Sequence, residues 1–184
     1  MMLRTLSAAL AISAFVAAMP AFAADGTITF NGVIRGQTCT ISGNGQGSNF
    51  SVALPPISKS ALANAGDFAG RTPFSIVLSN CTAADPGSTG TVATNFEPGP
   101  NVNLATGQLI VQAGTPNAAS NVELTLLNSD LSKIAVGGSA SNSKAVAISN
   151  GGATLNYYVQ YVAVNGAATP GTVTSTVQYT LVYN

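Results

Sequence analysis

Histidine and tryptophan are absent from this 184-residue chain, and cysteine occurs only twice. Without histidine, neither a Ser-His-Asp nor a Cys-His catalytic arrangement can be built, and a common metal ligand is missing. Most of the six acidic residues, Asp85 and Asp130 among them, lie in turn-like contexts, where carboxylates usually cap backbone donors rather than form a glycosidase pair. We therefore predict that the chain is not an enzyme and has no catalytic residue, metal or cofactor.

Charge is also scarce, because only 7% of the residues are charged and the six basic residues balance the six acidic ones. Ordinary domains contain roughly 25% charged residues. Nucleic-acid binding requires a clustered basic face, so we predict no nucleic-acid partner. A polar but uncharged surface repels copies of itself weakly and favours self-association, although it is equally compatible with an ordinary extracellular domain.

No apolar run in the chain reaches the length of about 20 residues that a membrane-spanning helix needs. The apolar stretch at residues 6–19 follows the basic residue Arg4 and precedes Ala21-Phe22-Ala23. A basic start, a short apolar run and small residues at the cleavage position are typical of a secretory signal peptide. We predict that residues 1–23 are removed and that the exported chain begins at Ala24.

Export favours a disulfide between Cys39 and Cys81, since two cysteines allow only one intramolecular pairing. A closed loop of about 43 residues restricts the unfolded chain by roughly 4 kcal/mol on the loop-entropy estimate. This contribution is comparable with the stability of a whole domain.

Short segments of alternating polarity, separated by clusters of Gly, Pro, Asn and Ser, predict an all-β sandwich of one domain. Only residues 58–69 indicate a short helix or helical turn. The segments predicted as strands are 27–34, 50–54, 74–78, 122–126, 155–164 and 173–183.

The segment at residues 173–183 has the most regular alternation. Ser175 alone interrupts its apolar row, and threonine and glutamine form the opposite row. A long apolar strand at the edge of a sandwich must pair its other side with something. The apolar row consists of Val173, Val177, Tyr179, Leu181 and Tyr183.

The first predicted strand places Ile28, Phe30, Gly32 and Ile34 on one face. Burial of the three large side chains contributes about 1.5 to 3 kcal/mol each, which approaches the total stability of a typical domain. The periodicity is compatible with docking in the chain's own domain, as an ordinary first strand, or on a neighbouring molecule.

Several motifs resemble those of the chaperone–usher pilins of the type 1 fimbrial major-subunit family, over essentially the whole exported chain. Their order and spacing together carry the resemblance, and residue 183 adds a penultimate tyrosine. The motifs are GTITFNGVI at 26–34, CTI at 39–41, VALPPIS at 52–58, GRTPFSI at 70–76 with NC at 80–81, and AATPG at 167–171.

The resemblance implies an immunoglobulin-like sandwich, residues 36–184, that lacks its last strand and is completed by a donor strand from a neighbouring subunit. It implies that residues 24–35 form the donor extension, with Ile28, Phe30, Gly32 and Ile34 as its inserted face. It also implies that the Cys39–Cys81 disulfide belongs to the family pattern. The acceptor groove and the chaperone-binding edge would then be formed by Val173, Val177, Tyr179, Leu181 and Tyr183.

The implied function is that of a structural subunit of a surface fimbria, which polymerises by donor-strand exchange and supports cell adhesion. Its implied partners are other copies, related pilins, a periplasmic chaperone and an outer-membrane usher, with export through the periplasm to the extracellular fimbrium. The alternative is a self-contained secreted carbohydrate-binding β-sandwich or fimbrial adhesin. Carbohydrate sites usually present aromatic platforms, whereas this chain has no tryptophan and its tyrosines cluster in two core-like strands.

Overall fold

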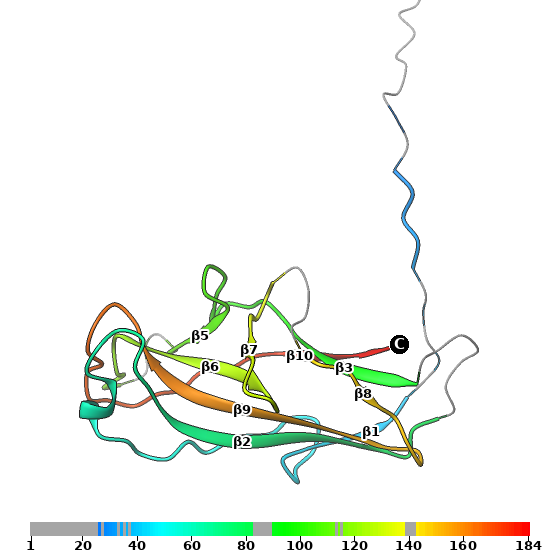
Figure 1. Cartoon of the computed structure of the whole chain (residues 1–184), viewed down its shortest axis with the longest axis horizontal. Coiled ribbons are helices and arrows are strands. Elements are labelled where there is room, and N and C mark those ends of the chain that lie inside the picture. The colour runs from blue at the N-terminus through cyan, green and yellow to red at the C-terminus, as the bar shows by residue number, and fades with distance from the viewer. Residues whose placement is uncertain are drawn as a thin grey trace, which may run out of the picture. The chain divides into compact units, whose positions relative to one another are not determined.

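The computed structural model describes most of the chain after the predicted signal peptide (Figure 1). It divides into two units, Met1–Val33 and Ile34–Asn184. Residues 1–23 and Ala24 lie outside the described part. The described residues are 26, 28–32, 34, 36, 38–82, 90–112, 114, 116–138 and 143–184.

The first unit contributes Gly26 and residues 28–32 to the described part, and none of these residues belongs to a helix or a strand. Ile28 and Phe30 are 79% and 89% exposed. A β-strand satisfies its backbone groups through a neighbouring strand, and no neighbouring strand pairs with these described residues. The sequence predicted a strand at 27–34, of which Thr27 and Val33 lie outside the described residues.

The second unit is a sandwich of two antiparallel sheets (Figure 1). The larger sheet has the order β1-β2-β9-β6-β5-β4, with β7 also paired to β6, and the smaller sheet has the order β10-β3-β8. The larger sheet consists of β1 (Thr40–Gly43), β2 (Phe68–Ser79), β4 (Val102–Asn103), β5 (Gln108–Ile110), β6 (Val122–Asn128), β7 (Lys133–Ile134) and β9 (Ala153–Ala163). The smaller one consists of β3 (Thr91–Phe96), β8 (Val146–Ala147) and β10 (Tyr179–Tyr183).

The hydrophobic core lies between the two sheets. Alternation along β2 buries Phe74, Ile76 and Leu78, whereas Val77 between them is 37% exposed. Leu155 of β9 and residues of β3 and β6 belong to the same cluster. The predicted strands at 74–78 and 122–126 lie inside β2 and β6, and that at 155–164 coincides with β9 to within two residues.

The segment 58–69, predicted to hold a short helix or helical turn, contains a single 3₁₀ turn, η1 (Lys59–Leu62), capped by the side chain of Ser58. A turn stops it, because the Asp67 carboxylate accepts a hydrogen bond from the Asn64 backbone N–H at 2.7 Å. The chain then enters β2 at Phe68. No helix in the described part of the chain is long and apolar enough to cross a membrane.

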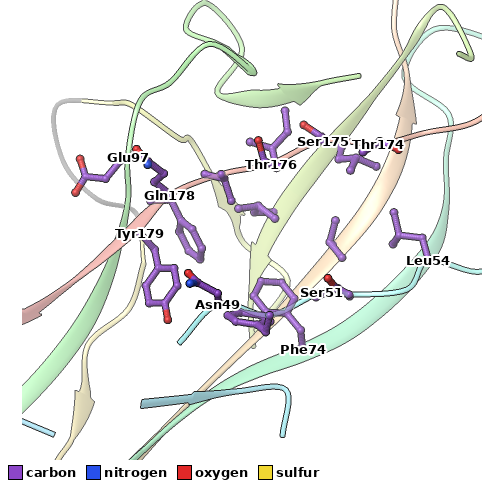
Figure 2. Close-up of a pocket in the computed structure, with 18 of the residues that line it drawn as sticks. Asn49, Ser51, Leu54, Phe74, Glu97, Thr174, Ser175, Thr176, Gln178 and Tyr179 are labelled. Carbon is purple, nitrogen blue, oxygen red and sulfur yellow. The ribbon is translucent and has the colours of Figure 1, made fainter. Parts of the chain in front are cut away.

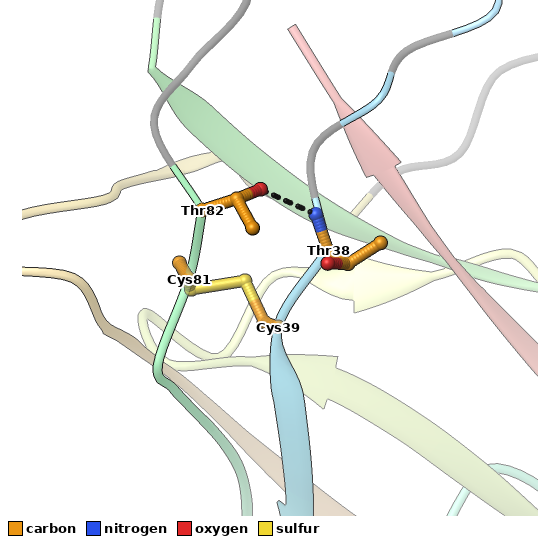
Figure 3. Close-up of a disulfide and its surroundings, with 4 residues drawn as sticks. All are labelled: Thr38, Cys39, Cys81 and Thr82. Carbon is orange, nitrogen blue, oxygen red and sulfur yellow. Dashed lines mark hydrogen bonds between the residues drawn. A yellow bond between two sulfur atoms is a disulfide. The ribbon is translucent and has the colours of Figure 1, made fainter.

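The predicted disulfide joins Cys39, which precedes β1, to Cys81, which follows β2 (Figure 3). Two hydrogen bonds flank it. The Thr38 N–H donates to the Thr82 hydroxyl, and the Thr82 N–H donates to the Thr38 carbonyl, both at 2.9 Å. The covalent link therefore fixes the start of β1 against the end of β2.

Reduction of this disulfide should lower the free energy of unfolding by about 4 kcal/mol, because the unfolded chain regains the entropy of an open loop. Denaturant midpoints measured with and without reductant test the expectation. The variant C39S/C81S is the control, since it has no other cysteine and should not respond to reductant. Equal midpoints for oxidised and reduced wild-type protein would contradict the expectation.

Candidate functional site

An open groove of about 830 Å³ lies between two extended segments, residues 48–54 and 173–180 (Figure 2). We call these segments the first wall and the second wall. Side chains of the sandwich core form the floor between them. The floor residues are Phe74, Phe96, Leu109, Leu124, Leu126 and Val159.

The first wall keeps the alternation that predicted a strand at 50–54 but belongs to no strand in the structure. Phe50, Val52 and Leu54 are half-buried, and Ser51 between them is exposed. The backbone of Ser51 bonds to a side chain instead of a strand, since its carbonyl accepts from Gln46 Nε2 at 3.1 Å. The first wall is therefore an extended segment without a β-partner among the described residues.

The second wall continues into β10. Half-buried and exposed residues alternate along it without interruption, because Ser175 is half-buried like its apolar neighbours. Val173, Val177, Tyr179, Leu181 and Tyr183 are all half-buried against the core. The first three line the groove, whereas Leu181 and Tyr183 lie beyond its lining. Of the predicted strand 173–183, only Tyr179–Tyr183 has a partner strand, which explains why β10 is shorter than expected.

Among the described residues, the backbone of the second wall forms hydrogen bonds along only one of its two edges. The Gln178 carbonyl accepts from the Glu97 N–H, and the Thr174 carbonyl accepts from the Gln112 N–H, both at 2.8 Å. Because successive residues of an extended chain direct their backbone groups to opposite sides, the odd-numbered residues present theirs to the groove. Among the described strands, β10 pairs with β3 alone.

The groove is almost uncharged. Glu97 is the single charged residue in its lining, and it lies at the rim, where Asn95 Nδ2 donates a hydrogen bond to its carboxylate at 2.7 Å. Within the described residues, no group of three or more His, Cys, Asp or Glu side chains could hold a metal. The site suits an extended, apolar and uncharged peptide segment.

Two tyrosines donate hydrogen bonds to the first wall and to Pro55, the residue that follows it. The Tyr179 hydroxyl donates to the Ser48 carbonyl at 2.8 Å, and the Tyr161 hydroxyl donates to the Pro55 carbonyl at 3.3 Å. Burial raises the pKa of both phenols above its ordinary value of 10. Both hydroxyls are therefore protonated donors at neutral pH.

Sequence reasoning assigned the second wall to the site but not the first. The available signal was the alternation of residues 50–54 and its end at Pro55-Pro56. Gly43 was also missed. It lies at the end of β1, where a Cβ atom would overlap the ring of Phe50, so only glycine lets this ring pack on the strand.

Among the described residues, the core of this sandwich opens between two extended segments that no strand joins, and proteins of similar sequence define the class of such a domain. The family model described as type-1 fimbrial protein, A (FimA) matches residues 54–184. The major fimbrial subunit SMF-1 of Stenotrophomonas maltophilia is 50% identical over 174 residues, which cover 91% of this chain and 98% of that protein. The F17 fimbrial protein of Escherichia coli is 40% identical over 95% of this chain and 96% of its own length.

Solved structures agree with these relatives. A chaperone–usher pilus structure superposes with a TM-score of 0.63 at 25% identity and covers 88% of this chain and 96% of that chain. The P pilus rod subunit PapA gives a TM-score of 0.61 at 25% identity, over 79% of this chain and 99% of that chain. The chain belongs to the type-1 fimbrial protein family and is a structural subunit of a pilus.

The first wall depends on the absence of a side chain at Gly43, so Gly43→Ala should lower the free energy of unfolding by about 1 to 3 kcal/mol through overpacking. Chemical denaturation measures this loss. Gly47→Ala is the matched control, because a Cβ atom there meets nothing within 4 Å and should change stability by less than about 0.5 kcal/mol. A Gly43→Ala protein as stable as the Gly47→Ala protein would contradict the packing argument.

Proposed function

We propose that the groove receives residues 28–34 of a neighbouring copy, so that the pilus grows by donor-strand exchange. The observation that carries this proposal is the pair of unpaired extended edges on either side of an open core. An exposed edge is a ready template for an added strand.

The backbone argument concerns both walls. A strand between them forms hydrogen bonds on its two sides and joins the first wall to β10 and β3. An inserted strand pairs about 4.8 Å from each neighbour, so it bonds to both walls only when it lies between them. The second wall, residues 173–180, and the segment 28–34 are also similar in length.

The side-chain argument concerns the apolar face of the donor. Ile28, Phe30 and Ile34 are 79%, 89% and 100% exposed in the single chain. Each contributes about 1.5 to 3 kcal/mol when it moves from water into an apolar site. Gly32 interrupts this face, and a residue without a side chain allows close approach to a shallow part of the groove.

The donor segment and the groove belong to different parts of the sequence, so the proposed contact between copies is head-to-tail. Such a heterologous contact propagates into an open filament. The near absence of charge on the chain removes most of the repulsion that would oppose stacking of many copies.

We further infer that a periplasmic chaperone fills the groove before the next subunit arrives and that an outer-membrane usher passes the subunit to the cell surface. An open apolar groove is an aggregation hazard in a single chain, which supports the need for a temporary occupant. One solved relative is described as a chaperone–usher pilus. The protein would thus travel through the periplasm and function in the extracellular fimbrium, where it supports adhesion.

A chain with residues 24–35 appended after Asn184 through a flexible linker, and removed from its own start, should be monomeric. It should also be more stable than the same chain without the appended segment by several kcal/mol, because the added strand closes the core. Denaturant midpoints and sedimentation measure both properties. No gain from the appended segment would contradict the proposal.

Polymerisation should depend on the apolar face of the donor and not on its other face. Phe30→Ser should slow or abolish filament formation by the mature chain, because it removes the largest inserted side chain. Thr29→Ser, on the opposite face of the same segment, should polymerise as the wild type does. Filament length by electron microscopy measures the difference, and equal filaments from both variants would contradict the assignment.

A further inference from the structure

One hydrogen bond joins the two walls of the groove directly. The Tyr179 hydroxyl of the second wall donates to the Ser48 carbonyl of the first wall at 2.8 Å. Figure 2 shows the Tyr179 ring extending from its strand toward the segment that carries Asn49. Among the described residues, no other hydrogen bond runs between residues 48–54 and 173–180.

Ring contacts reinforce this bond. Phe50 of the first wall meets Tyr179 edge to face, with the ring centroids 6.1 Å apart, and it also lies 6.2 Å from Phe74 of the floor. Aromatic pairs at such separations attract each other beyond the effect of buried area. Because the Phe50 ring also packs against Gly43, it has little room to move away.

We propose that Tyr179 is a gating residue for strand insertion: with Phe50 and the Ser48 carbonyl it forms a clasp that closes one end of the empty groove and opens as the donor strand docks. This proposal rests on the function proposed above. The Ser48 carbonyl faces the groove, since it accepts a bond from the opposite wall. A docked strand that pairs with the first wall supplies a backbone N–H to this carbonyl, so the phenol is displaced.

The clasp bond lies at an exposed end of the groove, since Ser48 is exposed. The phenol therefore contributes an ordinary hydrogen bond to the empty groove until a strand arrives. The hydrogen bond therefore stabilises the empty state and is absent from the docked state. Its loss should speed docking and leave the docked state unchanged.

The test measures docking of a fluorescent synthetic peptide of residues 24–36 to the freshly refolded mature chain by stopped-flow anisotropy. Tyr179→Phe keeps the ring and removes only the hydroxyl. Its association rate should rise about fivefold, the change that corresponds to one ordinary hydrogen bond, and its dissociation rate should not change. Tyr158→Phe is the matched control, because Tyr158 is half-buried on β9 outside the groove, and both of its rates should equal those of the wild type.

An unchanged association rate for Tyr179→Phe would overturn the clasp, and so would faster dissociation, which would mean that the phenol holds the docked strand. If Tyr179→Phe does not fold, the wild-type chain labelled with ¹³C-tyrosine gives the second readout. Peptide docking should shift the Tyr179 Cζ resonance as the hydroxyl loses its acceptor, and no shift would overturn the clasp. Failure of the peptide to bind the wild-type chain would instead overturn the donor-strand function, and the clasp with it.

Discussion

An extended backbone must pair on both of its edges or leave donors and acceptors unsatisfied, and this structure depends on that requirement. Two extended segments, 48–54 and 173–180, face each other, and none of the described strands lies between them. Buried core side chains of the sandwich, including Phe74 and Leu126, line the gap between these segments. Under the proposed function, a strand from another molecule fills this gap and couples assembly to completion of the core.

The rest of the fold holds this incomplete site in shape. The Cys39–Cys81 disulfide fixes the start of β1 on β2, and Gly43 at the end of β1 provides the surface on which Phe50 packs. Phe50 in turn contacts Tyr179 on the opposite wall. The disulfide, the packing of Phe50 on Gly43 and the contact of Phe50 with Tyr179 together keep the first wall close to the second wall, although no described β-ladder joins them.

The fold class and the longer strands could be predicted from the sequence, because alternation with period two reports burial on one face directly. Alternation predicted segments within β2, β6, β9 and β10, and their spacing between turn clusters predicted the sandwich. No strand was predicted at β1, β3, β4, β5, β7 or β8. For residues 58–69 the sequence left a short helix or a helical turn open, and the structure has the turn, because a second turn at residues 64–67 follows η1. Periodicity does not register such a local side-chain contact.

The sequence by itself determined which residues are apolar in alternation, including Ile28, Phe30 and Ile34 at the start and Val173, Val177 and Tyr179 near the end. It also determined the single cysteine pairing and the neutral surface. Only the tertiary structure decided that residues 48–54 oppose residues 173–180 and that Tyr179 reaches Ser48. The reason is physical: alternation records which face of a strand is buried, whereas the neighbour of each edge depends on contacts between segments more than 100 residues apart, as in the Tyr179–Ser48 pair with its separation of 131.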